Sequence, residues 1–177
     1  MSATLTSQPT GVAPIAPDAD NTLERFYVEH YLAMVRLAVL LVRDVGTAED
    51  VVQDAFVALH SRLGRLQDPE RAAGYLRQCV VNGARSHLRH GKIAALHLAS
   101  SPPDDRGPDE TVADQRVTVL SALAGLPTRQ REVLALRYYL DLTEYQIAET
   151  LGITPGSVKT HASRGAAALR SLLKEIR

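Results

Sequence analysis

The chain has 177 residues, equal numbers of acidic and basic side chains, and 45% hydrophobic residues, which suits one domain of average size or two small helical ones. Its single cysteine, Cys79, excludes a disulfide framework. The sequence contains neither an apolar run of about 18 residues nor a signal-peptide pattern, so we expect a cytoplasmic protein without a membrane segment. Residues 1–20 contain three prolines and few large apolar side chains, and we expect a disordered tail there.

The charges are sorted along the chain although they cancel overall. Residues 62–92 hold seven Arg or Lys and two Asp or Glu, and residues 157–177 hold five and one. Residues 100–114, between them, hold five acidic residues and one Arg. Two basic segments joined by an acidic one favour two modules that bind polyanions, and ordinary solvated helix faces are the alternative.

Helical periodicity runs through the first half of the chain. Apolar residues recur at intervals of three and four, first over residues 21–43 and then in a second segment that we expect Thr47 to cap. Asp68 and Pro69 open a third helix that is expected to end near Gly91. The three helices can form one small core, and the second presents an acidic outer face that includes Asp50, Gln53 and Asp54.

One face of the predicted third helix carries a mixture of cationic, aromatic and amide side chains. They fall at steps of three and four, namely Arg71, Tyr75, Gln78, Asn82, Arg85 and Arg89. Single-stranded DNA needs positive charge for its phosphates, a flat side chain for its bases and amides for the base edges. This stripe therefore favours a single-strand-binding surface, and a solvated amphipathic helix with Tyr75 packed at its rim is the alternative.

Helical periodicity fails over residues 94–114, where prolines, glycines and acidic residues predict a flexible linker. It resumes in the segment that follows. The sequence therefore predicts an all-α protein of two small helical domains, residues 21–93 and 115–177, joined by an acidic linker.

The second predicted domain contains a helix-turn-helix pattern. Thr143 and Gln146 form a capping box, Gly152 suits a left-handed turn, and Thr154 caps a further helix with Val158 as its apolar anchor. Such a helix enters the major groove with its N-terminal end leading. Candidate contacts to duplex DNA, with two phosphate contacts on the preceding helix, are Arg129, Arg131, Ser157, Lys159, Thr160, His161, Ser163 and Arg164. A structural helical hairpin is the alternative.

Several blocks of the sequence resemble the extracytoplasmic-function group of the sigma-70 family of RNA polymerase sigma factors. Residues 126–133 (LPTRQREV) and 152–165 (GITPGSVKTHASRG) are similar to region 4 of that family. Residues 48–56 (AEDVVQDAF) are similar to its region 2.2, and residues 74–89 (GYLRQCVVNGARSHLR) to its regions 2.3 and 2.4. The blocks stand in the family's order, and the resemblance covers residues 21–177.

The resemblance implies an alternative sigma factor, which binds core RNA polymerase, recognises promoters and starts transcription. The sequence has neither a Walker loop nor a Gly-rich nucleotide fingerprint, so we expect catalysis to belong to the polymerase and this chain to have no enzymatic activity, cofactor or metal. The acidic face with Asp50, Gln53 and Asp54 matches positions that dock on the beta-prime clamp helices, and the beta subunit is a further expected contact. The stripe on the third helix matches the segment that melts the −10 element, and the recognition helix matches the reader of the −35 element. Relatives are often held by an anti-sigma factor, which is therefore a further expected partner.

Three departures from the family pattern limit what carries over. Gln146 stands where Glu is common, His161 where Arg is common, and Tyr75 where Trp is frequent, so the resemblance does not predict a promoter sequence. A stand-alone helix-turn-helix regulator of duplex DNA is the main alternative, but it leaves the acidic face and the stripe without a role. The scattered histidines, without HExxH or CxxC motifs, argue against a metalloenzyme.

Overall fold

The structure, a computed structural model, describes residues 17–62, 68–97 and 119–175. These residues form helices and their connections, with no strand among them, which confirms the predicted all-α class. Within the described ranges, none of the helices is both long and apolar enough to cross a membrane.

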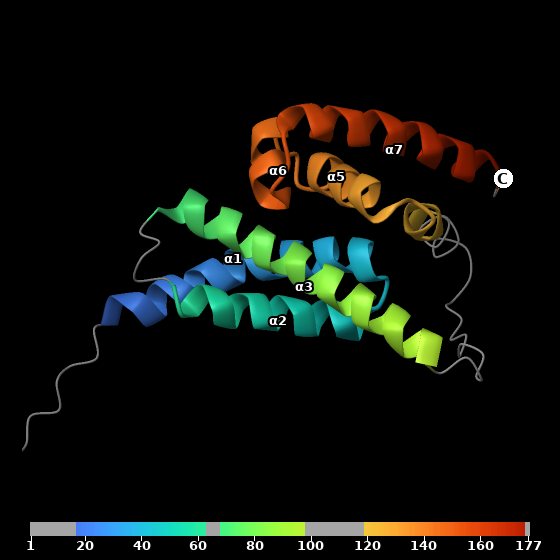
Figure 1. Cartoon of the computed structure of the whole chain (residues 1–177). Helices are drawn as coiled ribbons and strands as arrows, with labels where there is room; N and C mark the ends of the chain where they lie inside the picture. The colour runs from blue at the N-terminus through green and yellow to red at the C-terminus, as the bar shows by residue number, and fades with distance from the viewer. Residues whose placement is uncertain (1–16, 63–67, 98–118, 176–177) are drawn as a thin grey trace, which may run out of the picture.

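The N-terminal half consists of three long helices that pack against one another (Figure 1). They are α1 (Pro17–Val42), α2 (Val45–His60) and α3 (Pro69–His97). Their shared core is made of apolar side chains at helical spacing, of which the most deeply buried include Leu37, Ala38, Val52, Leu59, Leu76, Val80 and Val81. Burying each large aliphatic side chain contributes about 1.5–3 kcal/mol, so packing, more than helix propensity, stabilises these elements.

The start of α2 differs from the expected one, because Asp44 and not Thr47 is its N-cap. Arg43 adopts a left-handed conformation, with φ 69°, and the chain turns there between α1 and α2. Asp44 Oδ2 then accepts a hydrogen bond from the Thr47 backbone N at 2.7 Å, and this bond holds the pKa of Asp44 below its ordinary value. The prediction for Thr47 was wrong because the side chain of Asp44, three residues earlier, acts as the cap and accepts from the Thr47 backbone N–H itself.

The first helix is longer than expected. α1 begins at Pro17, a residue type that is favoured in the first turn of a helix. Residues 17–20, which were expected in the disordered tail, are therefore helical, and residues 1–16 lie outside the described residues.

The third helix begins at Pro69 as predicted but continues beyond its expected end, through Gly91 to His97. A Cβ at Gly91 would meet nothing within 4 Å, so this glycine marks no turn or close contact. It costs the helix only about 1 kcal/mol relative to alanine, which is too little to end it. Of the expected linker, residues 94–97 are helical, and residues 98–114 lie outside the described residues.

The C-terminal half contains a helical segment over residues 119–124 and three further helices. These are α5 (Thr128–Tyr138), α6 (Glu144–Leu151) and α7 (Pro155–Glu175). α7 lies close to α5 at Gly165, where a Cβ would come 3.1 Å from the Cβ of Gln130 and 3.2 Å from Leu134 Cδ1. A Cβ at this position would be tighter than an ordinary van der Waals contact, so a larger residue would require Gln130 or Leu134 to shift.

The local signals that predict the helix-turn-helix are all present. The Gln146 backbone N donates to Thr143 Oγ1 at 3.3 Å, and Gln146 Oε1 accepts from the Thr143 backbone N at 2.9 Å, which completes the capping box. Gly152 follows α6 in the left-handed conformation, with φ 63°. At the start of α7, Thr154 Oγ1 accepts from the Ser157 backbone N at 3.2 Å. The predicted helix-turn-helix is therefore confirmed.

Replacing Thr143 with alanine is expected to reduce the free energy of unfolding by about 1 kcal/mol, because the change removes the side-chain acceptor at the N-cap of α6. Thr143→Ser retains a hydroxyl and serves as the matched control. Chemical denaturation of the full chain measures both variants. Equal stability of the alanine and serine variants would show that the capping box contributes little.

The two halves contact each other through α3 with α6 and through α1 with α5. One apolar cluster includes buried side chains of α1, α2 and α3 together with those of α5 and α6. Leu40 of α1 also packs against the smaller cluster formed by Leu123, Leu126 and Leu134. α7 lies on the far side of α5 and α6 from the three N-terminal helices (Figure 1).

Candidate nucleic-acid interface

The N-terminal part of α7 presents its polar side chains outward. Lys159, Thr160, Ser163 and Arg164 are exposed, whereas Ser157 and His161 are half-buried. Three of these side chains have local partners. Thr160 Oγ1 donates to the Gly156 carbonyl at 3.0 Å, Lys159 Nζ lies 3.6 Å from Glu144 Oε2, and the Ser157 and Thr154 hydroxyls share a hydrogen bond of 2.9 Å. Within the described residues, no hydrogen bond or ion pair engages the guanidinium of Arg164, so Arg164 can reach a phosphate or a guanine edge without breaking a contact.

The polar stripe on α3 is only partly open, because α6 lies across its N-terminal portion. An open hollow of about 490 Å³ separates the two helices. Its walls include the stripe residues Arg71, Tyr75 and Gln78 from α3, and Glu149 and Thr150 from α6. The C-terminal half therefore faces the surface that the sequence predicts to bind single-stranded DNA.

Tyr75 is half-buried, and its ring lies next to a cation. The guanidinium carbon of Arg62 is 4.9 Å from the centre of the Tyr75 ring, which is a cation–π arrangement. A hydrogen bond with Cys79, followed by burial, raises the pKa of the Tyr75 hydroxyl. Tyr75 thus presents a neutral aromatic ring next to the cationic residues of the stripe.

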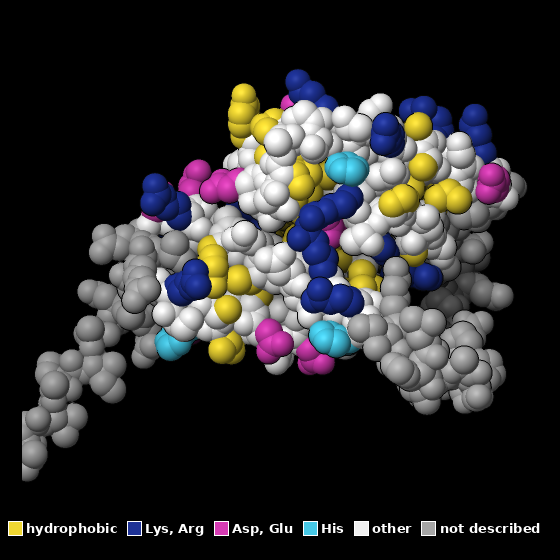
Figure 2. Space-filling view, viewed as in Figure 1, with side chains coloured by type: hydrophobic (Ala, Val, Ile, Leu, Met, Phe, Trp, Pro, Cys, Tyr) yellow, Lys and Arg dark blue, Asp and Glu magenta, His cyan; other side chains and the backbone are white. Residues whose placement is uncertain are grey.

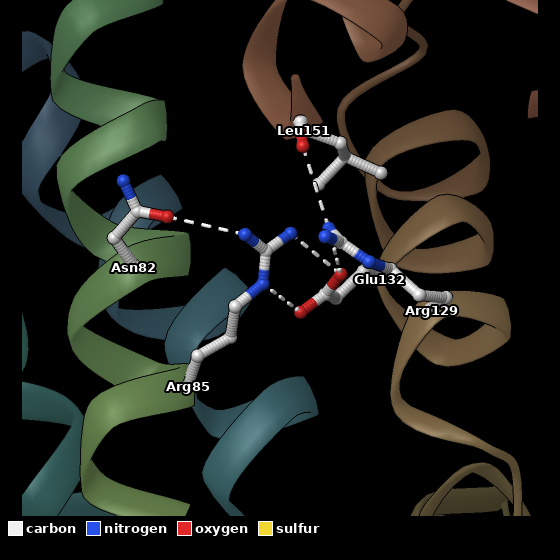
Figure 3. Close-up of polar contacts among 5 residues, drawn as sticks. All are labelled: Asn82, Arg85, Arg129, Glu132 and Leu151. Atoms are coloured by element: carbon white, nitrogen blue, oxygen red, sulfur yellow. Dashed lines mark hydrogen bonds and ion pairs between the residues drawn. The ribbon is translucent and has the colours of Figure 1, made fainter. Parts of the chain in front are cut away.

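Arg85, in the middle of the stripe, forms an ion pair with Glu132 of α5 (Figure 3). Arg85 Nε donates to Glu132 Oε1 at 2.5 Å and Arg85 Nη2 to Glu132 Oε2 at 2.8 Å. Arg85 Nη1 also donates to Asn82 Oδ1 at 3.2 Å. The Arg85 side chain is 25% exposed and that of Glu132 only 2%, so the carboxylate is buried where the two halves meet.

Arg129, which lies on α5 with Glu132, also contacts the Glu132 carboxylate. Its Nη1 lies 3.3 Å from Glu132 Oε2 and donates to the Leu151 carbonyl at 3.4 Å (Figure 3). Arg129 was predicted to contact a phosphate, and the structure places it in this network with its side chain 41% exposed. Part of its guanidinium is therefore committed to contacts inside the protein.

Two other arginines are poorly satisfied. Arg131, the second predicted phosphate contact, is only 8% exposed, and its Nε has no hydrogen-bond partner within the described residues. The Nε of Arg77 on α3 is likewise buried without a described partner. Burial lowers the pKa of both guanidiniums. In this arrangement Arg131 is shielded from DNA. The Nε atoms of both side chains have lost contact with water without gaining a described hydrogen-bond acceptor.

The acidic face of α2 is open. Asp50, Gln53 and Asp54 are all exposed, and Val57, one turn beyond Gln53, is 71% exposed. Asp50 and Asp54 also border an open hollow of about 500 Å³ that reaches Asn82 on α3. Exposed carboxylates beside an exposed aliphatic side chain suit a protein-binding surface.

Basic side chains gather where the two halves meet. Figure 2 shows Lys and Arg side chains running across the junction between the α6 and α7 end of the molecule and α3. Arg85 and Arg129 are among the basic residues at this junction. A polyanion would be attracted to this part of the surface.

Two family descriptions match the chain, "Sigma-70 region 2" over residues 26–92 and "Sigma-70, region 4" over residues 116–169. "ECF RNA polymerase sigma factor SigL" of Mycobacterium tuberculosis is 32% identical over 168 residues, which cover 91% of this chain and 94% of that protein. The chain belongs to the sigma-70 family. Its extracytoplasmic-function relatives are sigma factors, and this chain too is an alternative sigma factor that directs promoter recognition by RNA polymerase.

A further sigma-70 relative is much longer. "Probable RNA polymerase sigma factor RfaY" of Xanthomonas campestris pv. campestris is 31% identical over 146 residues, which are 77% of this chain and 36% of that protein.

Among solved structures, the sigma factor RpoE in complex with the anti-sigma factor NepR, from Bartonella quintana, matches with a TM-score of 0.71. The match has 20% identity and covers 89% of this chain and 99% of that one, which supports the same fold.

The sigma-70 matches divide the candidate residues between two regions. The region 2 segment contains the acidic face of α2 and the stripe of α3, and the region 4 segment contains the helix-turn-helix. The described residues contain no group of three or more His, Cys, Asp or Glu side chains that could hold a metal ion.

Sequence reasoning missed three residues that the structure places at the candidate sites: Glu132, Arg62 and Val57. Glu132 was noted only as part of the region 4 block, although its position four residues before the buried Leu136 places a carboxylate on the inner side of α5. Arg62 lies beyond the end of α2 at His60, so no helical pattern relates it to Tyr75. Val57 could have been noticed as an apolar residue outside the core spacing of α2.

Proposed function

We propose that this sigma factor divides its work among three surfaces. The acidic face of α2 binds core polymerase, the stripe on α3 binds the unpaired strand of the −10 element, and the outer face of α7 binds the −35 duplex. One observation carries the proposal: a single chain combines a helix-turn-helix having an outward-facing second helix with a separate surface suited to unpaired bases. Duplex binding alone requires only the first of these.

The proposal also names the protein partners of this sigma factor and the compartment in which it acts. The carboxylates of α2 suit the clamp helices of the beta-prime subunit, and the C-terminal half is expected to contact the beta subunit. Chemistry belongs to the polymerase, so the chain has no catalytic activity, and it acts in the cytoplasm. An anti-sigma factor is a further proposed partner, supported by the RpoE structure, in which a sigma factor of the same fold is bound to NepR.

Run-off transcription tests the proposal directly. Sigma-free core polymerase is given a pool of genomic fragments with and without the full chain. Defined transcripts that appear only with the chain are the expected result. Binding to duplex DNA without any binding to polymerase would instead favour a stand-alone regulator.

Asp50→Arg is expected to reduce affinity for core polymerase several-fold, because it reverses a charge on the exposed docking face. Glu175→Arg makes the same charge change on an exposed side chain at the end of α7 and is expected to leave the affinity unchanged. Biolayer interferometry with immobilised core polymerase compares the two. Equal affinities would remove the α2 face from the proposed interface.

A further inference from the structure

We propose that the ion pair between Arg85 and Glu132 is an intramolecular clasp, which holds the C-terminal half over the single-strand-binding face of α3 in the free protein. The proposal rests on the proposed function, since it takes the α3 stripe as the −10 contact. It adds regulation of that surface by the chain itself, through two residues that lie 47 positions apart in the sequence.

The pair is built to couple the two halves. Both oxygens of Glu132 accept from Arg85, at 2.5 and 2.8 Å, in the bidentate geometry that favours arginine over lysine. A carboxylate that is only 2% exposed needs such a partner. Arg129, on the same helix as Glu132, supplies a single contact at 3.3 Å. Loss of Arg85 would therefore leave Glu132 buried and poorly neutralised.

The clasp also occupies the groups that DNA would use. Arg85 donates hydrogen bonds from Nε and Nη2 to the Glu132 carboxylate and from Nη1 to Asn82 Oδ1, the last at 3.2 Å. These donors are therefore not free to bind a phosphate or a base. Further along α3, Arg71, Tyr75 and Gln78 line the hollow beneath α6. Tyr75 and Arg85 are the half-buried members of the stripe, whereas Arg71, Gln78, Asn82 and Arg89 remain exposed. In the closed arrangement α5 and α6 therefore restrict the access of a single strand to the aromatic ring and the central arginine. The outer face of α7 is not covered in this way (Figure 1), so the closed protein keeps its duplex-binding surface.

The closed arrangement buries two arginine donors that lack described partners, and this burial opposes closure. The Nε atoms of Arg77 and Arg131 are buried without described partners, and a buried donor that lacks an acceptor opposes the arrangement that buries it. Apolar packing such as that of Leu40 favours closure. The Arg85–Glu132 pair adds to the contributions that favour closure, so we expect its loss to shift the balance toward the open state.

The test uses the full chain with Glu132→Gln, which preserves the shape of the side chain and removes its charge. Small-angle X-ray scattering of the free protein is expected to show a larger radius of gyration than for the unaltered chain. Fluorescence anisotropy with a labelled poly(dT) strand is expected to show about tenfold higher affinity, since a rarely populated open state reduces the apparent affinity in proportion to its population. Circular dichroism verifies that the helices are retained.

Glu144→Gln is the matched control, because it makes the same change at a half-buried carboxylate that pairs with Arg137 at 3.5 Å and Lys159 at 3.6 Å, all within the C-terminal half. It is expected to change neither the radius of gyration nor the strand affinity. Arg85→Met removes the other side of the clasp and is also expected to expand the protein. It is followed by scattering alone, because Arg85 belongs to the strand-binding stripe.

Unchanged dimensions in both Glu132→Gln and Arg85→Met would overturn the clasp. Expansion of Glu132→Gln without a gain in poly(dT) affinity would overturn the claim that closure covers the strand-binding face. Failure of the unaltered chain to support run-off transcription would remove the proposed function. The scattering comparison would still decide whether the pair holds the two halves together.

Discussion

Replacing Arg164 with alanine is expected to weaken binding to duplex −35 DNA by about 1–3 kcal/mol, or roughly fivefold to a hundredfold. Arg164 is exposed on the N-terminal part of α7, the end that leads into the major groove in helix-turn-helix proteins. Because the guanidinium is not engaged by another described residue, its loss removes a DNA contact without unfolding the site.

Arg170→Ala provides the control, since it removes the same side chain from an exposed position further along α7. Electrophoretic mobility shifts over a series of salt concentrations measure both variants. If Arg164 contacts a phosphate, the slope of log affinity against log salt falls by about one, whereas a base contact changes sequence preference instead. Equal affinities of Arg164→Ala and Arg170→Ala would exclude a special role for Arg164.

Asn82→Ala is expected to reduce formation of the open promoter complex by about fivefold to a hundredfold while polymerase binding stays unchanged. The Asn82 amide is exposed on α3, and one amide that reads an unpaired base edge contributes about 1–3 kcal/mol. The change also removes Asn82 Oδ1, which accepts the 3.2 Å hydrogen bond from Arg85 Nη1, so the guanidinium of Arg85 is held by one hydrogen bond fewer.

Permanganate footprinting of unpaired thymines measures opening, and a mobility shift with core polymerase measures binding in the same preparation. A promoter with a pre-melted −10 segment separates two roles of Asn82. Full recovery on this template would place Asn82 in strand separation, and a persistent defect would place it in base capture. A parallel loss of polymerase binding would contradict the division of labour between α2 and α3.

The helix-turn-helix could be predicted from sequence because its determinants are local. Thr143, Gln146, Gly152 and Thr154 act through hydrogen bonds or backbone angles within a few residues of themselves. Such signals are read from spacing alone. The same is true of Pro69 at the start of α3.

The junction between the halves could not be predicted in this way. Arg85 and Glu132 lie on helices whose periodicities are independent, and no local rule relates one to the other. The stripe on α3 was expected to face solvent, and the half-burial of Tyr75 and Arg85 within it depends on tertiary packing, which no local pattern describes. Arg131 shows the same limit, since its sequence position suits a phosphate contact and its burial follows from tertiary packing.

The error at α2 has a different cause. Thr47 and Asp44 are both acceptable capping residues, and the choice between them depends on the left-handed turn at Arg43. A non-glycine residue rarely adopts that conformation, so the sequence gives no signal for it.

The contact between Arg62 and Tyr75 means that the aromatic platform on α3 is already in use. In the proposed strand-binding role of Tyr75, a nucleobase that stacks on the ring would displace a guanidinium whose carbon lies 4.9 Å from the ring centre, so that stacking would exchange one flat group for another. The displaced Arg62 is then released beside the strand, where its charge can meet the adjoining phosphate. The same arginine can thus occupy the ring before the strand arrives and neutralise the backbone afterwards.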